Sequence, residues 1–205
     1  MSLRASYTFL APFYDFVIER LFSDLRARSL SALPRTGPLD VLVDGIGTGL
    51  DLPHLPAQHR YIGLDLTRAM LDRAIKRRDQ LNVNFVQANS LRLPFKDEAF
   101  DHAVLHLILA IVPDSVRCLQ EASRVLKPGG SVLILDKFLH RGESARFRRA
   151  LNPAASRLVS RLDVVFEDVF ARTPELNLVS DEGVLLGGWI RKIVLAKTEA
   201  ARDAR

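Results

Sequence analysis

The chain has 205 residues, of which 48% are hydrophobic and 26% are charged. This composition is that of a packed globular protein and excludes collagen-like, repetitive and disordered chains. The length suits one α/β domain with a modest appendage. Because Cys118 is the single cysteine, neither an internal disulfide nor a thiolate metal cluster can form, so we expect a reduced, cytoplasmic protein without a structural metal.

The net charge of +5 is concentrated in one segment. Residues 140–161 contain six arginines and one glutamate, which equals the whole formal excess. The arginines are Arg141, Arg146, Arg148, Arg149, Arg157 and Arg161. Such a local patch indicates an anionic surface or substrate, either a phosphate-bearing lipid or a nucleic acid. The alternative is an ordinary solvated helix face.

The apolar stretches do not predict a membrane span. The longest, residues 103–112, contains His106 and is much shorter than the ~20 residues that a spanning helix needs. Near the N-terminus, Asp15 and Glu19 interrupt the apolar run, so the order of regions in a signal peptide is missing. We therefore expect a cytoplasmic location.

In chain order, the first predicted element is an amphipathic helix over residues 5–33. Its apolar side chains recur every three or four residues from Phe9 to Leu25, and Pro34 and Gly37 end it. The next segments alternate, with strands expected at 39–43, 61–64, 83–86, 103–107 and 131–135 and helices at 67–80 and 115–126. This alternation predicts βαβ crossovers and a doubly wound parallel sheet.

After residue 137 the pattern changes. The Lys-Pro-Gly-Gly sequence at 127–130 ends the preceding helix and turns into a strand. The basic segment 140–161 looks helical, with a kink or boundary at Pro153. Residues 176–180 and 189–195 read as two closing strands joined by a glycine-containing turn. The tail from Thr198 is polar enough to be disordered.

A glycine-rich turn directly follows the first strand. Residues 41–53 read Val-Leu-Val-Asp-Gly-Ile-Gly-Thr-Gly-Leu-Asp-Leu-Pro. Glycines at this place allow a ligand to approach the backbone and the amides of the following segment. Gly45, Gly47 and Gly49 have the spacing G-x-G-x-G, whereas a dinucleotide fingerprint requires a glycine where this chain has Leu50.

Polar residues follow the neighbouring strands. Asp65 closes the second strand, 16 residues after Gly49, where a carboxylate can accept hydrogen bonds from both hydroxyls of a ribose. Asp65 could instead cap the helix that begins near Thr67, but the glycine turn favours the ribose. The next two strands end in Asn89, Ser90, Leu91, Leu105 and His106. Open α/β sheets bind ligands at these carboxyl ends.

Five segments in this order carry a resemblance: DGIGTGLDLP, YIGLDLTRAML, VQANSLRLPF, FDHAVLHLILAIVP and EASRVLKPGG. Together they resemble the S-adenosylmethionine-dependent methyltransferases of the seven-stranded Rossmann-like class over residues 40–137. A narrower resemblance, to bacterial phosphatidylethanolamine N-methyltransferases and the related ubiquinone/menaquinone methyltransferases, rests on LHLILAIVPD, DKF, residues 146–153 and LLGGWIRKIVLAK.

The resemblance implies an α/β fold with a doubly wound, mostly parallel seven-stranded sheet, an antiparallel last strand and an amphipathic N-terminal helix. It implies one methyltransferase domain over 1–205, with a helical lid at 1–36, a cofactor-binding core at 37–137, a basic helical insertion at 138–173 and closing strands at 174–197. The implied cofactor is S-adenosyl-L-methionine, with S-adenosyl-L-homocysteine as product and no metal.

The same resemblance implies a set of cofactor contacts. They are Gly45, Gly47, Gly49, Asp65, Leu66, Met70, Asn89, Ser90, Leu91 and Leu105. Leu66 and Met70 would flank the adenine, although packing in the helix core accounts equally well for Met70.

Two positions depart from the family pattern. The acidic residue usual two places before the first glycine is Val43 here, and Asp44 follows it. On a strand this shift turns the carboxylate to the opposite face, away from the methionine amino group. Asn89 stands where the family often has Asp, and its carbonyl oxygen can still accept a hydrogen bond from an adenine amino group.

The expected reaction requires positioning more than acid–base chemistry. In-line methyl transfer needs the nucleophile about 3 Å from the methyl group, and an amine acceptor must first lose its proton. The catalytic candidates are Tyr7, Tyr14 and His106, and a tyrosine face could also stabilise a quaternary ammonium product. The alternatives are a core aromatic stripe for Tyr14 and a core histidine for His106.

For the acceptor we favour the amine of phosphatidylethanolamine. The N-terminal helix would lie in the headgroup region, and Arg146, Arg148 and Arg149 would bind anionic lipid or the substrate phosphate, as in a peripheral membrane enzyme. The alternatives are a methyltransferase acting on a quinone precursor or another small molecule, an RNA methyltransferase and a non-catalytic cofactor-binding protein. RNA is disfavoured because the chain has no recognisable base-stacking aromatic set.

Overall fold

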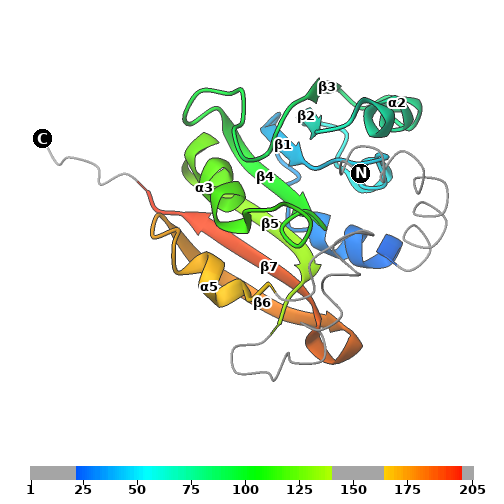
Figure 1. Ribbon diagram of the computed structural model, residues 1–205. Coiled ribbons are helices and arrows are strands. Elements are labelled where there is room, and N and C mark those ends of the chain that lie inside the picture. The colour runs from blue at the N-terminus through cyan, green and yellow to red at the C-terminus, as the bar shows by residue number, and fades with distance from the viewer. Residues whose placement is uncertain (1–21, 140–163, 200–205) are drawn as a thin grey trace, which may run out of the picture.

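The computed structural model describes residues 22–139 and 164–199. Seven strands form one sheet in the order β3-β2-β1-β4-β5-β7-β6 (Figure 1). Their bounds are β1 Asp40–Asp44, β2 Arg60–Asp65, β3 Val83–Gln87, β4 Phe100–His106, β5 Leu126–Lys137, β6 Leu176–Leu185 and β7 Ile190–Lys197. The first five strands pair in parallel, and β7 is antiparallel to both β5 and β6. The seven-stranded, mostly parallel sheet expected from the sequence is therefore confirmed.

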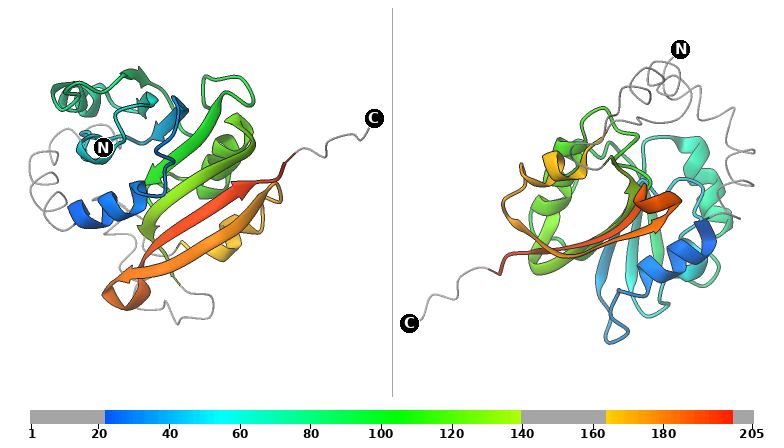
Figure 2. Two further views of the ribbon diagram at one scale, coloured as in Figure 1. Left: turned by 180° about the vertical axis from the view of Figure 1, so that it is seen from behind. Right: turned by 90° about the horizontal axis from the view of Figure 1, so that it is seen from below.

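Helices cover both faces of this sheet, as Figure 2 shows. Residues 22–30 are helical and lie with α2 (Arg68–Lys76) on one face, and α3 (Ser115–Val125) and α5 (Phe166–Phe170) lie on the other. Short 3-10 turns occur at η1 (Leu52–His54) and η2 (Leu186–Gly188). The part of the predicted N-terminal helix before residue 22 and the basic segment 140–163 lie outside the described residues.

The core consists of two apolar layers because side chains alternate between the faces of each strand. In β1, Leu42 packs in the layer that contains α3 residues such as Leu119, whereas Val41 and Val43 pack in the layer of α2 and residues 22–33. These strands are buried on both faces, which explains the continuous apolar runs of the sequence.

The structure changes several expected boundaries. The helix expected at 67–80 ends at Lys76. The strand expected at 103–107 starts at Phe100 and ends at His106, because Leu107 has a positive φ of 56°. Residues 127–130 lie within β5 rather than between a helix and a strand. Ladder pairing with β4 is interrupted between Phe100 and His102, so this stretch forms an irregular start of the strand.

Candidate active site

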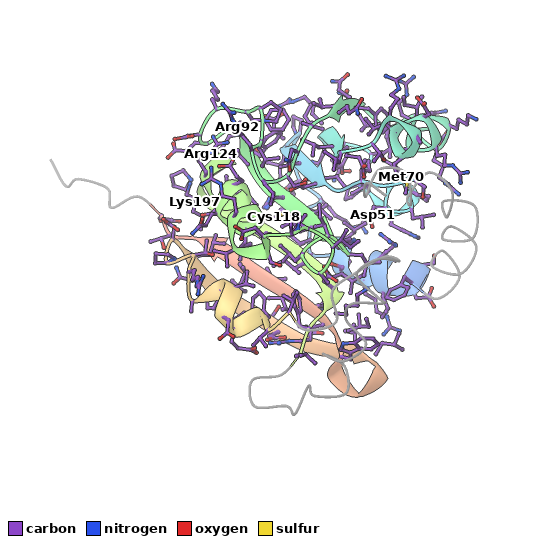
Figure 3. All side chains as sticks on the ribbon, in the orientation of Figure 1. Asp51, Met70, Arg92, Cys118, Arg124 and Lys197 are labelled. Atoms are coloured by element: carbon purple, nitrogen blue, oxygen red, sulfur yellow. The ribbon has the colours of Figure 1, made fainter. Side chains whose placement is uncertain are left out.

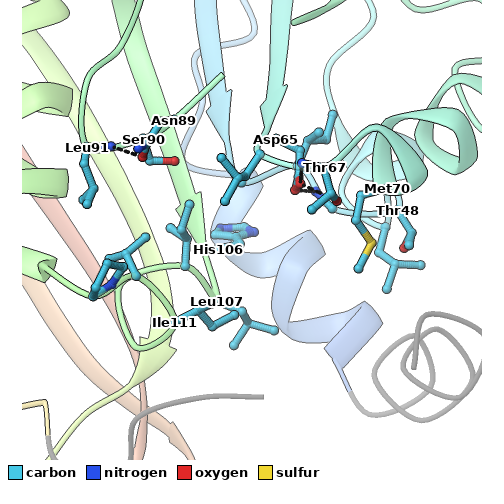
Figure 4. A pocket seen from close by; sticks show the side chains of 18 of the residues that line it. Thr48, Asp65, Thr67, Met70, Asn89, Ser90, Leu91, His106, Leu107 and Ile111 are labelled. Carbon is cyan, nitrogen blue, oxygen red and sulfur yellow. Dashed lines mark hydrogen bonds between the residues drawn. The ribbon is translucent and has the colours of Figure 1, made fainter. Parts of the chain in front are cut away.

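A cavity of about 220 Å³ opens at the carboxyl ends of β1, β2 and β4 (Figure 4). Its walls come from the turn after β1, the start of α2, the loop after β3 and the loop after β4. The lining residues are Arg26, Gly45, Ile46, Gly47, Thr48, Leu50, Asp65, Leu66, Thr67, Met70, Asn89, Ser90, Leu91, His106, Leu107, Ile108, Ile111, Val112 and Pro113. Most of these side chains are apolar. Of the polar ones, Asp65 and Thr67 lie on one side of the cavity, and Asn89 and Ser90 lie apart from them in the loop after β3.

The glycine turn leaves space for a ligand beside its backbone. Gly47 has a φ of +56°, and a Cβ built on it would meet only the Gly45 carbonyl oxygen, at 3.9 Å, although the residue lines the cavity. Gly49, which the sequence also predicted as a cofactor contact, does not line the cavity, and its Cβ would lie 2.9 Å from the Ala74 Cα. One glycine therefore keeps the cavity open, and the other lets α2 pack directly against the turn.

Asp65 faces the cavity and also organises its walls. Its Oδ2 accepts a hydrogen bond from the Gly47 amide at 3.0 Å, and its Oδ1 accepts one from the Thr67 amide at 2.9 Å. Burial raises the pKa of Asp65 above its ordinary value, and the bonds from both amides oppose the shift. The capping contact at Thr67 is thus present, and it leaves the carboxylate on the cavity wall where the sequence predicted a ribose contact.

A buried polar cluster lies at one end of the cavity. Asp51 Oδ1 accepts from Arg26 Nη1 and lies against His106 Nδ1, each at 2.7 Å. On the other side of the ring, His106 Nε2 lies 2.9 Å from the Ser29 hydroxyl. All four residues are at most 5% exposed. Burial alone would raise the pKa of Asp51, but Arg26 and His106 hold it well below the ordinary value.

This cluster limits what His106 can do. The ring lines the cavity, but both of its nitrogens already have hydrogen-bond partners. In this arrangement the histidine is a satisfied core residue, and its side chain is fully buried behind the cavity wall. To take a proton from a substrate, the Nε2 of His106 would first have to break its hydrogen bond with the Ser29 hydroxyl.

The sequence analysis missed Arg26, Ser29 and Asp51. The available signal was a charge inside the apolar stripe of the first helix, since Arg26 follows Phe22 by four residues and adjoins Leu25. Figure 3 shows Asp51 and Met70 on the side of the sheet that carries α2. Among the residues that the structure describes, the buried Arg26 Nε has no hydrogen-bond partner, and Arg26 lines the cavity, so this nitrogen is a candidate donor for an anionic group of a ligand.

Asp44 and Val43 point to opposite faces of β1, as the pleat requires. Asp44 is fully buried, accepts a hydrogen bond from the Ser90 hydroxyl at 2.6 Å and lies 3.9 Å from the Cys118 sulfur. Burial raises its pKa to about 7. Asp44 does not line the cavity, so it supports the Ser90 loop from behind.

Of the other predicted cofactor contacts, Leu66, Met70, Asn89, Ser90 and Leu91 line the cavity. The Asn89 Oδ1 accepts a hydrogen bond from the Leu91 amide at 2.9 Å, which holds the loop after β3.

Leu105 corrects the prediction. It is fully buried in the core on the α3 face and does not line the cavity, because alternation along β4 turns it away from the face of His106. The remaining predicted site residues, Tyr7, Tyr14, Arg146, Arg148 and Arg149, lie outside the described residues.

Comparison with known proteins gives the family. Residues 39–134 match the model of a methyltransferase domain. The chain is 31% identical over 180 residues to a phosphatidylethanolamine N-methyltransferase of Cereibacter sphaeroides, covering 85% of this chain and 88% of the relative. It is 32% identical over 158 residues to a 2-phytyl-1,4-naphtoquinone methyltransferase of Nostoc sp., covering 71% and 68%. The chain belongs to the S-adenosylmethionine-dependent methyltransferases.

The fold of this methyltransferase is shared with distant solved structures. One is the complex between the Haloferax volcanii Trm112 methyltransferase activator and a methyltransferase, which aligns with a TM-score of 0.77 at 16% identity and covers 98% of this chain and 100% of that one. Among the described residues, no three His, Cys, Asp or Glu side chains are grouped to hold a metal ion. In the same residues, no helix is long and apolar enough to cross a membrane.

Three observations indicate that the cavity of this methyltransferase fits S-adenosylmethionine. The open space at Gly47 admits a ligand beside the backbone. The Asp65 carboxylate on the wall can accept hydroxyl hydrogen bonds. The unpartnered Arg26 Nε can donate to a carboxylate. A ligand with an adenosine at one end and an amino acid at the other matches this donor and acceptor set.

Proposed function

We propose that this methyltransferase transfers methyl groups to the amine of phosphatidylethanolamine. The observation that carries the proposal is the likeness to a phosphatidylethanolamine N-methyltransferase over 85% of the chain and 88% of that relative. The alignment with the quinone methyltransferase covers less, 71% of this chain and 68% of that relative.

In this proposal the cofactor lies between α2 and the loop after β4. Asp65 binds the ribose, Leu66 and Met70 pack on the adenine, and Asn89, Ser90 and Leu91 form the wall beyond it. Gly47 allows the ligand to approach the backbone closely. Arg26 binds the methionine carboxylate through its free Nε. S-adenosyl-L-methionine, when bound, supplies an electrophilic methyl group on a sulfonium.

The acceptor amine enters beside the loop after β4. Leu107, Ile111 and Val112 give this side of the cavity apolar walls, which exclude water from the reacting groups. Within the loop, the Ala110 amide donates to the buried Asp136 carboxylate at 3.1 Å, so the loop is tied to the end of β5.

The reaction needs a group that takes a proton from the acceptor amine. Tyr7 and Tyr14 remain our candidates for it, because an amine must be neutral before it can act as a nucleophile. We assign His106 a positioning role first, since Asp51 and Ser29 occupy its ring nitrogens.

The described residues also support attachment at a lipid surface. The Leu139 amide donates to the Val164 carbonyl at 2.8 Å, so the basic segment between these residues leaves and returns at one point. That point follows the carboxyl end of β5, which is the edge of the sheet that holds the cavity. In this proposal the arginines at 146, 148 and 149, which lie outside the described residues, bind anionic lipid.

A quinone precursor is the second candidate acceptor, because naphthoquinone methyltransferases share 32% identity with this chain over 158 residues. Binding of such an acceptor would not require the arginines of the basic segment 140–161.

The test is to incubate the purified protein with S-adenosylmethionine radiolabelled in its methyl group and vesicles containing phosphatidylethanolamine. We expect label in mono-, di- or trimethylated lipid after extraction. Phosphatidylcholine vesicles, whose amine is already fully methylated, are the control. Cofactor binding without any labelled lipid would contradict the proposal and direct the assay to demethylated quinones.

A further inference from the structure

Among the described residues, no side chain or carbonyl forms an ion pair or a hydrogen bond with the ammonium of Lys137, the last residue of β5. Of the four lysines in the described strands, the other three are paired: Lys127 with Asp101 at 2.7 Å, Lys192 with Glu182 at 3.0 Å and Lys197 with the Leu126 carbonyl at 2.7 Å. Within the described part of the chain, Lys137 is half-buried and makes no side-chain hydrogen bond or ion pair. Burial lowers its pKa below the ordinary value.

The neighbouring Asp136 carboxylate attracts this charge and opposes the effect of burial on the pKa of Lys137, but no ion pair joins the two side chains. Asp136 is fully buried, and its oxygens accept hydrogen bonds from the amides of Ala110 at 3.1 Å and Lys137 at 2.8 Å. Because successive side chains of a strand point to opposite faces, the Asp136 carboxylate and the Lys137 ammonium lie on different sides of the sheet.

Strand register places Lys137 on the face of His106. Leu135 pairs with His106 in β4, and Lys137 lies two residues further along β5, opposite Ile190 in β7. Leu135 and Ile190 share an apolar cluster with Phe22, Leu25 and Leu107. From the usual strand spacing and rise, the Cα atoms of His106 and Lys137 are roughly 8 Å apart.

Lys137 does not line the cavity itself, but a lining residue, Leu107, is bonded to its strand. Leu107, which lines the cavity, is bonded through its amide to the Leu135 carbonyl at 2.8 Å. The chain after β4 then turns away, while β5 continues to Lys137. Figure 1 shows this end of β5 close to the helical residues 22–30, which contribute Arg26 to the cavity. A four-carbon stem lets the ammonium reach beyond the end of the strand.

We propose that Lys137 binds the phosphate of the methyl acceptor, which makes the end of β5 the headgroup phosphate subsite of the proposed lipid methyltransferase. In phosphatidylethanolamine two carbons and an ester oxygen separate the amine from the phosphorus. An amine beside His106 therefore leaves its phosphate one strand away, at β5. Lysine is a point charge that suits phosphate oxygens, and a phosphate would supply the direct contact that Asp136 does not make.

This inference rests on the proposed function, so its test uses two measurements. The first compares steady-state methylation of phosphatidylethanolamine vesicles by the wild type, Lys137→Gln and Lys137→Arg. Lys192→Gln is the matched control, because Lys192 lies on the same face but is paired with Glu182. We expect Lys137→Gln to raise KM for the lipid at least tenfold, with a smaller change in kcat, and Lys137→Arg to restore most of the loss. A KM equal to that of the control would overturn the proposal.

The second measurement needs no turnover. Glycerophosphoethanolamine, the soluble headgroup, is titrated calorimetrically into protein saturated with S-adenosyl-L-homocysteine. We expect binding that Lys137→Gln weakens at least tenfold and Lys192→Gln leaves unchanged. If the wild type methylates no lipid, the proposed function fails, and Lys137-dependent binding of glycerophosphoethanolamine would still support the subsite. Binding that does not depend on Lys137, or equal affinity for inorganic phosphate, would overturn it.

Discussion

The Asp65 carboxylate holds the turns of the cavity wall, and in our proposal it also binds the ribose of the cofactor. Its two oxygens hold the amides of Gly47 and Thr67, so they fix the cavity wall before any ligand arrives. Removing the carboxylate should therefore cost both a ribose contact and the order of the turn.

We expect Asp65→Ala to weaken S-adenosylmethionine binding by about 2–3 kcal/mol, because charge-assisted hydrogen bonds are lost. This corresponds to a roughly 30- to 150-fold rise in the dissociation constant, measurable by calorimetric titration. Asp72→Ala, which removes an exposed carboxylate of α2 paired with Arg68, is the control. A dissociation constant within twofold of the wild type would exclude Asp65 from the ribose site.

Asp44 gives the stability of the fold a pH dependence. Burial raises its pKa from 3.8 to about 7, so between these values the folded state keeps a proton that the unfolded state has lost. The free energy of unfolding then falls as the pH rises through this window and levels off above it.

The substitution Asp44→Asn should remove this slope and keep an acceptor for Ser90. From about pH 5.5 to about pH 7.5, we expect the wild type to lose about 2 kcal/mol more stability than the variant. Urea unfolding at the two pH values measures the difference. Parallel losses in both proteins would mean that Asp44 is ionised in the folded state.

At the scale of elements, the sequence predicted those strands and turns that depend on neighbouring residues alone. The strands from β1 to β4 follow apolar runs bounded by turns, and the glycine turn and Asp65 follow a motif. α5 lies inside the helical insertion expected at 138–173, but its bounds could not be predicted because Phe166–Phe170 is too short to show a helical period. The Arg26–Asp51 pair escaped because its partners lie 25 positions apart, and such pairings depend on how helix 22–30 packs.

That pair attaches the helical residues 22–30 to the turn before η1. We expect Asp51→Asn to destabilise the protein by about 3–5 kcal/mol, since it leaves the buried charge of Arg26 uncompensated. Asp40→Asn breaks the exposed ion pair with Arg60, also at 2.7 Å, and should cost about 1 kcal/mol or less. Equal losses in urea unfolding would show that the Arg26–Asp51 pair adds no more than a surface contact.

The contact between the glycine turn and α2 can be tested in the same way. Gly49→Ala places a Cβ 2.9 Å from the Ala74 Cα, whereas Gly37→Ala at a similar positive φ meets nothing within 4 Å. Both pay the left-handed penalty of about 1 kcal/mol, and the clash should add about 1–3 kcal/mol at Gly49. Similar unfolding midpoints for the two variants would show that α2 shifts away from the added Cβ at little cost in stability.

At the scale of the whole molecule, charge and cavity share one edge of the sheet. The parallel strands end at the cavity, Lys137 ends β5 there, and residues 140–163 leave and return between Leu139 and Val164. The segment that holds the formal charge excess is therefore attached where an acceptor would enter.

We expect replacement of Arg146, Arg148 and Arg149 together by Gln to weaken binding to anionic vesicles by about 3 kcal/mol, since each charge near the surface contributes about 1 kcal/mol. Cofactor affinity should not change. The matched control replaces Arg60, Lys76 and Arg78 by Gln. These replacements remove the same number of positive charges, from exposed residues before or at the starts of β2 and β3. Vesicle sedimentation at fixed salt measures both variants. Equal weakening would mean that net charge alone drives attachment, whereas a loss confined to the first variant places the lipid surface at the mouth of the cavity.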